Sequence, residues 1–265
     1  MYDHYKRPIN YLRISVTDRC NLRCNYCMPT DGVKLMSLDD ILSFEEIEDF
    51  TRLAVSKGIN KVRLTGGEPL VRKDIITLVK RLAAIEGLED LSMTTNGILL
   101  EQFAGELKAA GLKRVNISLD TVNPDRYCEI TRTGNIQQVF KGIESAQKVG
   151  FDPIKINCVL LAEPDEEILR LKQYCTANKL DLRFIHQMDL QNGEFSKVEG
   201  GEGGNCNRCN RIRLLANGDV KPCLFSDLAY NIRQVGHEKA LDLSIANKPK
   251  SGTFNKSGEF YNIGG

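Results

Sequence analysis

Six short apolar runs, rich in β-branched residues, alternate with amphipathic stretches of helical length, and this alternation limits the fold more than any other feature of the chain. The expected strands are Leu12–Val16, Lys61–Leu64, Leu91–Thr94, Arg114–Leu119, Ile154–Leu160 and Asp181–His186. The expected helices are Phe44–Lys57, Asp74–Ile85, Leu99–Ala110, Ile136–Val149 and Glu166–Asn178. Strands separated by helices pair in parallel through right-handed crossovers. The sequence therefore predicts an α/β fold whose chemistry lies at the carboxyl ends of the strands.

Local signals mark several helix ends. Ser43 followed by Glu46 is typical of a capping box at the start of the first helix. Gly58, Gly111 and Gly150 stand where helix C-terminal glycines are expected. A chain of 265 residues is long enough for one large α/β barrel domain.

The charge balance excludes several classes of function. Thirty-six Lys and Arg residues face 35 Asp and Glu residues, and no run of like charge indicates a nucleic-acid tail or an anionic-membrane anchor. The N-terminus lacks the apolar core of a signal peptide, and no apolar run approaches the ~18 residues of a membrane span. Nine cysteines in such a chain favour the reducing cytoplasm, where thiols serve metals or catalysis.

Six of the nine cysteines form two sets of three. The first set is Cys20, Cys24 and Cys27, and the second set is Cys206, Cys209 and Cys223. A cubane iron–sulfur cluster is normally held by four thiolates, so a set of three leaves one iron open, as in a reactive site. We therefore expect two 4Fe-4S clusters. A zinc site is the alternative, although structural zinc prefers four ligands with paired C-x2-C spacing.

Several polar or glycine-rich motifs follow the predicted strands. Gly66-Gly67-Glu68-Pro69 ends the second strand, where glycine lets the backbone approach a ligand closely, although a simple strand-to-helix turn is the alternative. Thr94-Thr95-Asn96-Gly97 and Ser118-Leu119-Asp120 end the third and fourth strands, and Met188 lies just beyond the sixth. Helix capping by Ser118 and Asp120 and core filling by Met188 are the alternatives to ligand contacts.

The run Cys20–Cys27, with the aromatic Tyr26 before its last cysteine, resembles the signature of the radical S-adenosylmethionine (SAM) superfamily. The resemblance implies a partial TIM barrel, (β/α)6, and a first cluster whose open iron chelates the amino and carboxylate groups of SAM. It also implies a 5′-deoxyadenosyl radical that abstracts a hydrogen atom from the substrate. The residues expected to bind SAM are Tyr26, Gly66, Gly67, Glu68, Ser118, Asp120 and Met188.

The segment Cys206–Phe225 resembles the auxiliary-cluster region of the GTP 3′,8-cyclase family, which begins molybdenum cofactor biosynthesis. Arg7-Pro8, the run Leu12–Cys20 and the terminal Gly264-Gly265 carry the same resemblance. It implies that the second cluster binds the purine of GTP, that basic residues clamp the triphosphate, and that the C3′ radical of ribose attacks guanine C8. The implied product is (8S)-3′,8-cyclo-7,8-dihydroguanosine 5′-triphosphate.

By this resemblance a set of mostly basic side chains lines the nucleotide cavity: Arg13, Arg63, Thr94, Lys155, Arg183, Arg211 and Arg213. The expected catalytic residues are Arg211, Arg213, Gly264 and Gly265. A charged residue within a barrel strand is costly unless it has a partner. Four of the basic residues lie on different predicted strands, which favours a shared placement of their side chains inside the barrel. They are Arg13, Arg63, Lys155 and Arg183. A solvated outer face for the basic residues and a frayed terminus for the glycines are the alternatives.

The resemblance divides the chain into a partial barrel (7–190), a glycine-rich connector (191–205), and an auxiliary-cluster region with a polar tail (206–265). Relative to the family, the segment before the second cluster is several tens of residues shorter, and His186-Gln187 replaces the usual Glu before Met188. Cys128, Cys158 and Cys175 have no ligand-like spacing, and we expect Cys158 and Cys175 to be buried.

Three other functions stay open. They are a paralogous radical SAM enzyme acting on another nucleotide or sugar, a radical enzyme that modifies peptides, and an electron-transfer or zinc-binding module. Peptide modifiers usually carry more cysteines in their auxiliary region. The partners expected are a small-molecule nucleotide (GTP) and a flavodoxin- or ferredoxin-like reductant, with no nucleic acid and no membrane, and a homodimer is compatible with the resemblance.

Overall fold

The computed structural model describes residues 1–161, 165–256 and 260, and these residues contain one nine-stranded sheet. Its strands are β1 (Tyr11–Ser15), β2 (Lys61–Thr65), β3 (Asp90–Thr95), β4 (Arg114–Ser118), β5 (Lys155–Leu160), β6 (Asp181–His186), β7 (Arg211–Leu214), β8 (Asp219–Lys221) and β9 (Tyr230–Asn231). Its helices are α1 (Phe44–Ser56), α2 (Ile75–Ala83), α3 (Leu100–Ala109), α4 (Pro124–Thr131), α5 (Ile136–Lys148), α6 (Asp165–Ala177), α7 (Ile232–Val235) and α8 (His237–Ala246), with short 3-10 turns at Pro69–Val71 and Cys206–Arg208.

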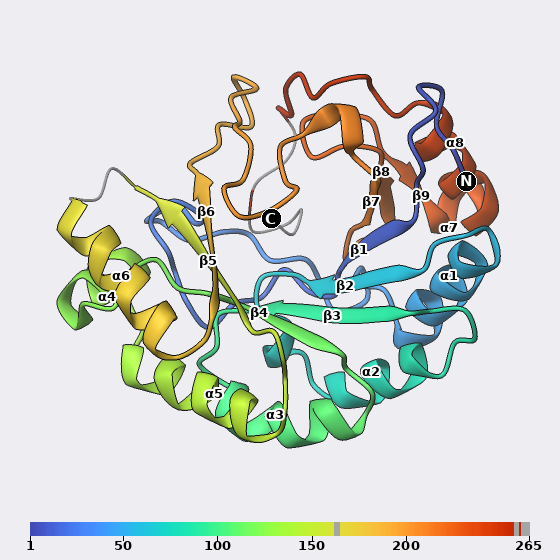
Figure 1. Ribbon diagram of the computed structural model, residues 1–265. Coiled ribbons are helices and arrows are strands. Elements are labelled where there is room, and N and C mark those ends of the chain that lie inside the picture. Colours follow the sequence, from blue (N-terminus) through green and yellow to red (C-terminus); the bar gives the residue numbers. More distant parts are fainter. Residues whose placement is uncertain (162–164, 257–259, 261–265) are drawn as a thin grey trace.

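The sheet order is β6-β5-β4-β3-β2-β1-β7-β8-β9, and β1 to β6 are parallel, as the alternating pattern predicts. Figure 1 shows the sheet curving, with α2, α3, α5 and α6 on its outer side and loops toward its interior. The fold is thus a partial barrel. β7 pairs in parallel with β1, so the second cysteine region continues the same sheet.

Alternation along the strands places charge inside the barrel and apolar side chains against the helices. Leu12 and Ile14 of β1 are fully buried in the main hydrophobic core, which also contains Val62 and Leu64 of β2. Arg13, between the two β1 residues, is therefore on the opposite face of the sheet. In the strand register Arg13 stands beside Arg63 of β2. The alternation of side chains along the strands thus directs these guanidinium groups toward the interior of the barrel.

The predicted capping box is present, because the Ser43 hydroxyl accepts from the Glu46 amide and the Glu46 carboxylate accepts from the Ser43 amide. The expectation of a polar tail was incomplete. The tail contains α8, whose Ala240, Leu241 and Ile245 pack in the main core. Helix α4 was also missed, although Asn123 caps it and Pro124 occupies its first position.

The glycine-rich connector is attached to the edge of the barrel. Phe184 of β6 and Glu199 exchange both backbone hydrogen bonds, with N to O distances of 3.1 and 3.0 Å. A Cβ on Gly200 would lie 2.8 Å from the carbonyl oxygen of Leu182, so the connector's glycines allow its close approach to β6. The connector therefore forms a short wall beside the last barrel strand.

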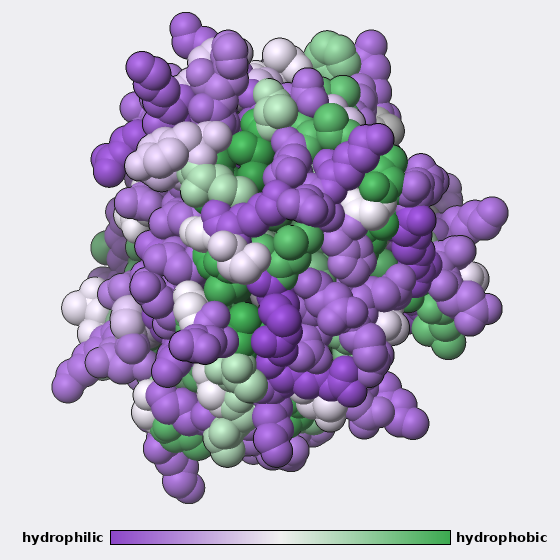
Figure 2. All heavy atoms as spheres, turned by 90° about the vertical axis from the view of Figure 1, so that its right-hand side faces the viewer, coloured by the Kyte–Doolittle hydropathy of each residue, from purple (hydrophilic) through white to green (hydrophobic). Residues whose placement is uncertain are grey.

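Figure 2 shows the side of the molecule on which α1, α7 and α8 lie in Figure 1. Hydrophilic side chains cover most of this face, and the hydrophobic ones form an interrupted band. Within the described part of the chain, no helix combines the length and the apolar character needed to span a bilayer.

Candidate active site

A cavity of about 300 Å³ lies inside the barrel at the carboxyl ends of the strands. The structure brings together there most of the site residues predicted from the sequence. They are Cys20, Cys24, Cys27, Tyr26, Gly66, Gly67, Glu68, Ser118, Met188, Arg13, Arg63, Thr94, Arg183 and Arg211. One cavity thus joins the first cysteine set to the predicted basic residues.

The loop that carries the first cysteine set is held by the end of α4. The amides of Arg23 and Asn25 donate to the carbonyl oxygens of Thr131 and Ile130, over 3.2 and 2.9 Å. The guanidinium of Arg132 donates to the carbonyl oxygens of Arg23 and Met28, over 2.9 and 3.0 Å. These contacts fix the loop from outside the barrel, so the cysteines face the cavity.

The environment of the first set suits thiolates bound to iron. Burial, together with the charges of Asp120, Cys27 and Cys20, raises the pKa of Cys24 to about 12. Such thiols become thiolates only when iron supplies compensating positive charge. Among the described residues no three His, Cys, Asp or Glu side chains are grouped tightly enough for one metal ion. A cubane cluster has a different requirement, because each thiolate binds its own iron.

The glycines of the Gly66-Gly67-Glu68 motif have a packing role that the sequence did not indicate. A Cβ on Gly67 would lie 2.2 Å from the carbonyl oxygen of Arg19, just before the first cysteine. The amides of Gly67 and Glu68 donate to the carbonyl oxygens of Thr17 and Arg19, both over 2.8 Å. Only glycine therefore fits at position 67, where the second strand end packs on the cluster loop.

Glu68 presents a buried carboxylate beside the cluster loop. It accepts hydrogen bonds from the Thr95 hydroxyl (2.7 Å) and the amides of Asn96 (2.6 Å) and Leu70 (3.1 Å). Burial nevertheless raises the pKa of Glu68 to about 7. The Asn96 side chain donates to Oδ1 of Asn21 in the cluster loop, over 2.7 Å. The motifs at the ends of β2 and β3 thus support the loop together.

Asp120 contacts the protein through both of its carboxylate oxygens. Oδ2 accepts from the Tyr26 hydroxyl over 3.0 Å, and Oδ1 accepts from the Val159 amide over 2.7 Å. Asp120 is not among the residues that line the cavity, whereas Ser118 and Met188 are. The structure therefore gives Asp120 a positioning role, which joins Tyr26 of the cluster loop to β5. Its predicted contact with SAM stays a prediction.

Arginines of the barrel strands and β7 form a basic wall at the other side of the site. This basic wall consists of Arg13, Arg63, Arg183, Arg211 and Arg213. Arg13 stands in register with Arg63 on one side and with Arg213 of β7 on the other. Burial lowers the pKa of Arg13 well below its ordinary value, and Arg213 lowers it further. Burial also lowers the pKa of Arg213 to about 10, with Arg211 as the next cause. Each of these guanidinium groups therefore disfavours the charged form of its neighbours until an anion is bound.

Unsatisfied polar atoms indicate that the basic wall binds a ligand. Nε of Arg211 and Oγ1 of Thr94 are buried without a hydrogen-bond partner in the described part of the chain. None of the ion pairs found among the described residues involves Arg63, Arg183 or Arg211. The guanidiniums of Arg63 and Arg211 lie 5.6 and 5.8 Å from the ring centroid of Tyr11. A polyanion would satisfy this arrangement.

Lys155 and Arg213 are the two predicted basic residues outside the cavity lining. Lys155 is half-buried on β5, and burial lowers its pKa. Arg213, in register with Arg13, lies close enough to the second cysteine set for Cys223 and Cys209 to act on its pKa. The predicted catalytic Gly264 and Gly265 lie outside the described residues.

The second cysteine set is half-buried between β7, β8 and the segment after α8. Burial alone would raise the pKa of Cys209, but the Lys248 ammonium and the Arg211 amide outweigh burial and lower it. Burial raises the pKa of Cys223, which Lys248 partly opposes. The donor set fits a second three-thiolate cluster, with Arg211 and Arg213 between it and the cavity. Cys158 and Cys175 are buried, as expected, and Cys128 is exposed.

Sequence reasoning missed part of the cavity wall. Asn157 of β5 and four connector residues line the cavity, and the latter are Val198, Gly201, Glu202 and Gly203. A glycine-rich segment predicts a flexible linker, so composition gave no signal for this placement. The only available signal was position, since the connector follows directly after β6.

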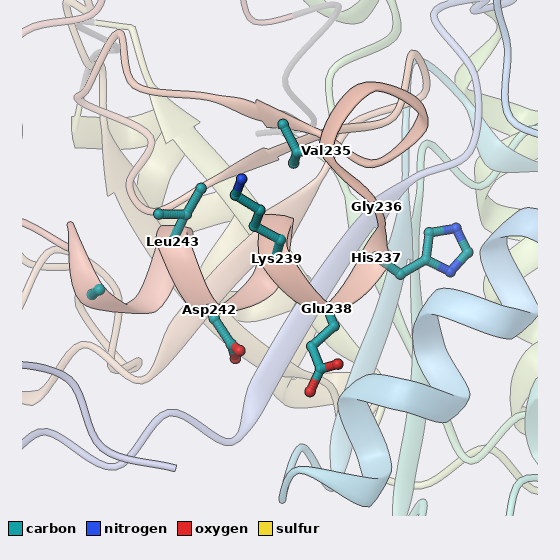
Figure 3. Close-up of a pocket in the computed structure, with 8 residues that line it drawn as sticks. Val235, Gly236, His237, Glu238, Lys239, Asp242 and Leu243 are labelled. Carbon is teal, nitrogen blue, oxygen red and sulfur yellow. The ribbon is translucent and has the colours of Figure 1, made fainter.

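A larger, open hollow of about 540 Å³ lies along α8, outside the barrel. Figure 3 shows the carboxylates of Glu238 and Asp242 on one side of this helix. Both pair with Lys57, at N to O distances of 2.9 and 2.7 Å. The residues of this hollow include none from either cysteine set, and the smaller barrel cavity is therefore the candidate active site.

Comparisons with known proteins agree with this geometry. Residues 14–175 match the profile of the radical SAM superfamily. Among solved structures, Streptococcus suis SuiB bound to its precursor peptide SuiA superposes with a TM-score of 0.67 at 20% identity, covering 91% of this chain and 65% of that one. anSMEcpe with bound AdoMet gives a TM-score of 0.64 at 18% identity, covering 90% and 81%. These likenesses establish the fold. The chain is a member of the radical SAM superfamily.

Curated relatives show to which family of the superfamily the chain belongs. GTP 3′,8-cyclase of Moorella thermoacetica is 44% identical over 279 residues, covering 88% of this chain and 86% of that protein. GTP 3′,8-cyclase of Peptoclostridium acidaminophilum is 40% identical and covers 100% of this chain and 98% of that protein. Within the superfamily, the chain belongs to the GTP 3′,8-cyclase family.

The chain is shorter than these relatives, as expected from the sequence. The alignment with the Peptoclostridium protein extends over 320 positions, whereas this chain has 265 residues, so the difference corresponds to gaps in this chain.

Proposed function

We propose that the chain binds SAM at the first cysteine set and GTP between the basic wall and the second set, and converts GTP into (8S)-3′,8-cyclo-7,8-dihydroguanosine 5′-triphosphate. This reaction begins molybdenum cofactor biosynthesis. The observation that carries the proposal is the position of the basic wall, which lies between the two cysteine sets and shares one cavity with the first.

Electrostatics supports a triphosphate at the basic wall. Arg13, Arg63, Arg183 and Arg211 line the cavity, and burial lowers the pKa of the first three. Buried guanidiniums stabilise a bound anion strongly, because they bind phosphate oxygens in pairs and lose less hydration than an ammonium would. The carboxylate of Glu202 also lines the cavity, and it is exposed. Net positive charge therefore dominates this side.

The first cluster and SAM, when bound, would supply the radical chemistry needed to remove the hydrogen atom at ribose C3′ of the nucleotide. The protein itself would hold SAM and the nucleotide at two points each. Cys20, Cys24 and Cys27 hold the cluster, and Glu68 accepts hydrogen bonds from the SAM amino group. The basic wall would fix the triphosphate, and Cys206, Cys209 and Cys223 would hold the second cluster, which would bind the purine. Held at both ends, the nucleotide keeps C3′ and C8 close enough to join.

The surrounding residues keep the site closed to competing reactions. β6 and the connector cover one side through the Phe184 and Glu199 backbone pair. The catalytic role of Gly264 and Gly265 is part of the proposal, by the family resemblance. We also place the enzyme in the cytoplasm, with a flavodoxin- or ferredoxin-like reductant, and we include a homodimer in the proposal.

A second candidate is a radical SAM enzyme of the same fold acting on another nucleotide or sugar. The shorter chain favours it, because we expect the missing residues to lie before the second cluster, where the connector lines the cavity. The two functions differ only in the substrate that fits between the basic wall and the second cluster.

The test is an anaerobic incubation of reconstituted protein with SAM, dithionite and one nucleotide, followed by mass spectrometry. We expect 5′-deoxyadenosine and a product with the mass of GTP but a new retention time. ATP and CTP are the matched substrates. Turnover of one of these in place of GTP would support the second candidate, and 5′-deoxyadenosine formation unaffected by any nucleotide would overturn both.

A further inference from the structure

Lys248, which follows α8, has an ammonium group buried among the segments that carry the second cysteine set. Its side chain is only 3% exposed. The ammonium donates to the carbonyl oxygen of Arg211 over 2.7 Å and to that of Pro222 over 2.6 Å. Arg211 begins β7 two residues after Cys209, and Pro222 directly precedes Cys223. One side chain therefore joins the two segments that carry these cysteines.

The ammonium also lies close enough to the second cysteine set for its charge to act on two of the thiols. Lys248 lowers the pKa of Cys209 and opposes the rise that burial causes in the pKa of Cys223. A lysine ammonium has three N–H donors, and the two carbonyl oxygens use two of them. A smaller or apolar side chain in this position would leave both carbonyl oxygens unpaired.

The charge of Lys248 has no carboxylate to balance it. None of the ion pairs found within the described residues includes Lys248. A buried cation without an anionic partner is strongly destabilising. A cluster held by three thiolates brings negative charge to the place where the ammonium points. The Lys248 ammonium would thus balance the negative charge of a second cluster, and the cluster would provide the anionic partner for Lys248.

We propose that Lys248 is a positioning residue for the second cluster. Its ammonium fixes the spacing of the segments bearing Cys209 and Cys223, donates a hydrogen bond to the Cys209 sulfur, and balances the charge of the cluster. The inference rests on the proposed second cluster. Because a positive charge and an N–H···S hydrogen bond favour the reduced state of an iron–sulfur cluster, Lys248 also raises its reduction potential.

The test compares three variants of the full-length protein. Lys248→Met removes the charge and the donors, Lys248→Arg keeps both, and Lys250→Met changes an exposed lysine two residues further on. We expect wild type and Lys250→Met to hold about eight irons. For Lys248→Met we expect an about 10-fold or greater loss of affinity for the second cluster in a chelator titration, as for other supports of metal ligands. Lys248→Arg should recover most of this loss.

The reduction potential is measured in a Cys20→Ala, Cys24→Ala, Cys27→Ala background, where only the second cluster remains. Here Lys248→Met should make reduction at least about tenfold less favourable, which corresponds to about 59 mV for a one-electron couple. If Lys248→Met does not fold, as judged by circular dichroism, Lys248→Gln replaces it, because glutamine keeps a donor and loses the charge.

The outcomes separate the two proposals. If the background variant binds no cluster even with Lys248 present, the second cluster itself is wrong and the proposed function fails. If the cluster forms, but its affinity and potential are the same with methionine or glutamine at position 248, the inference about Lys248 is wrong and the proposed function stands.

Discussion

The guanidinium of Arg7 donates a hydrogen bond to the carbonyl oxygen of Cys206, over 2.7 Å. It also donates to the carbonyl oxygens of Pro249 and Lys250, over 2.6 and 3.0 Å, and its Nε pairs with Asp3 over 2.6 Å. The first residues of the chain thus hold both the first cysteine of the second set and the segment after α8. This contact joins the two ends of the sequence at the second cluster site.

Replacing Arg7 by Met should destabilise the protein strongly. The Asp3 carboxylate is fully buried, and the change leaves it without its cation and leaves three carbonyl oxygens without their donor. Breaking a buried ion pair in this way costs about 3–5 kcal/mol. Chemical denaturation measures the loss. Arg52→Met, which breaks an exposed pair with Glu48, is the control and should cost below about 1 kcal/mol. Similar losses for the two variants would contradict the structure.

The Gly67→Ala variant should lose the first cluster. An added Cβ would lie 2.2 Å from the carbonyl oxygen of Arg19, so the segment leading into Cys20 must move. Gly105→Ala in α3 is the control, because its Cβ meets nothing within 4 Å and alanine favours the helix by about 1 kcal/mol. Iron content after reconstitution distinguishes them. A Gly67→Ala protein with full iron content and unchanged SAM binding would show that the packing is not required.

SAM binding should weaken in acid through Glu68. The folded protein raises the pKa of this carboxyl to about 7, so the charged form that accepts from the SAM amino group is present only above that pH. The charged fraction falls from about 0.9 at pH 8 to about 0.1 at pH 6. The ratio of SAM affinities between wild type and Glu68→Gln should therefore fall about tenfold over this range. A constant ratio would mean that Glu68 does not titrate there.

Arginine 211 should be needed for the nucleotide and not for SAM. Its buried Nε lacks a partner within the described residues, so removing it costs little in the free protein and about 1.5–3 kcal/mol with a bound phosphate, equivalent to about 10- to 150-fold in GTP affinity. SAM cleavage without substrate should persist in Arg211→Ala, and the same pattern is expected for Arg213→Ala. Arg208→Ala, an exposed neighbour, is the control. Equal loss of SAM cleavage and GTP turnover would indicate a role in folding.

The six barrel strands could be predicted from the sequence because each is long enough, and sufficiently rich in β-branched residues, to show its pattern. The expected range Asp181–His186 matches β6, and the other five strands differ by one residue at one or both ends. β7, β8 and β9 contain four, three and two residues, which is too short for any periodicity. β7 reaches the sheet by pairing with β1 across about 200 positions of sequence, and local patterns do not report such a contact.

The candidate site could also be predicted only in part from the sequence. Cysteine spacing and strand-end motifs identified the residues that line the cavity. The supports of the site were not predictable, because no local pattern shows that the side chains of Arg7 and Lys248 reach the second set. Asp120 shows a further limit. Its position at a strand end predicted a ligand contact, which stays a prediction, but did not indicate that both of its oxygens accept hydrogen bonds from protein groups.

The measurement that tests the central claim most directly is electron paramagnetic resonance of the reduced protein with one cysteine set replaced by alanine at a time. With only Cys20, Cys24 and Cys27 present, SAM should change the spectrum and GTP should not. With only Cys206, Cys209 and Cys223 present, GTP should change the spectrum and SAM should not. Spectra that respond to neither ligand, or to the same ligand in both variants, would contradict two open clusters that face a shared cavity.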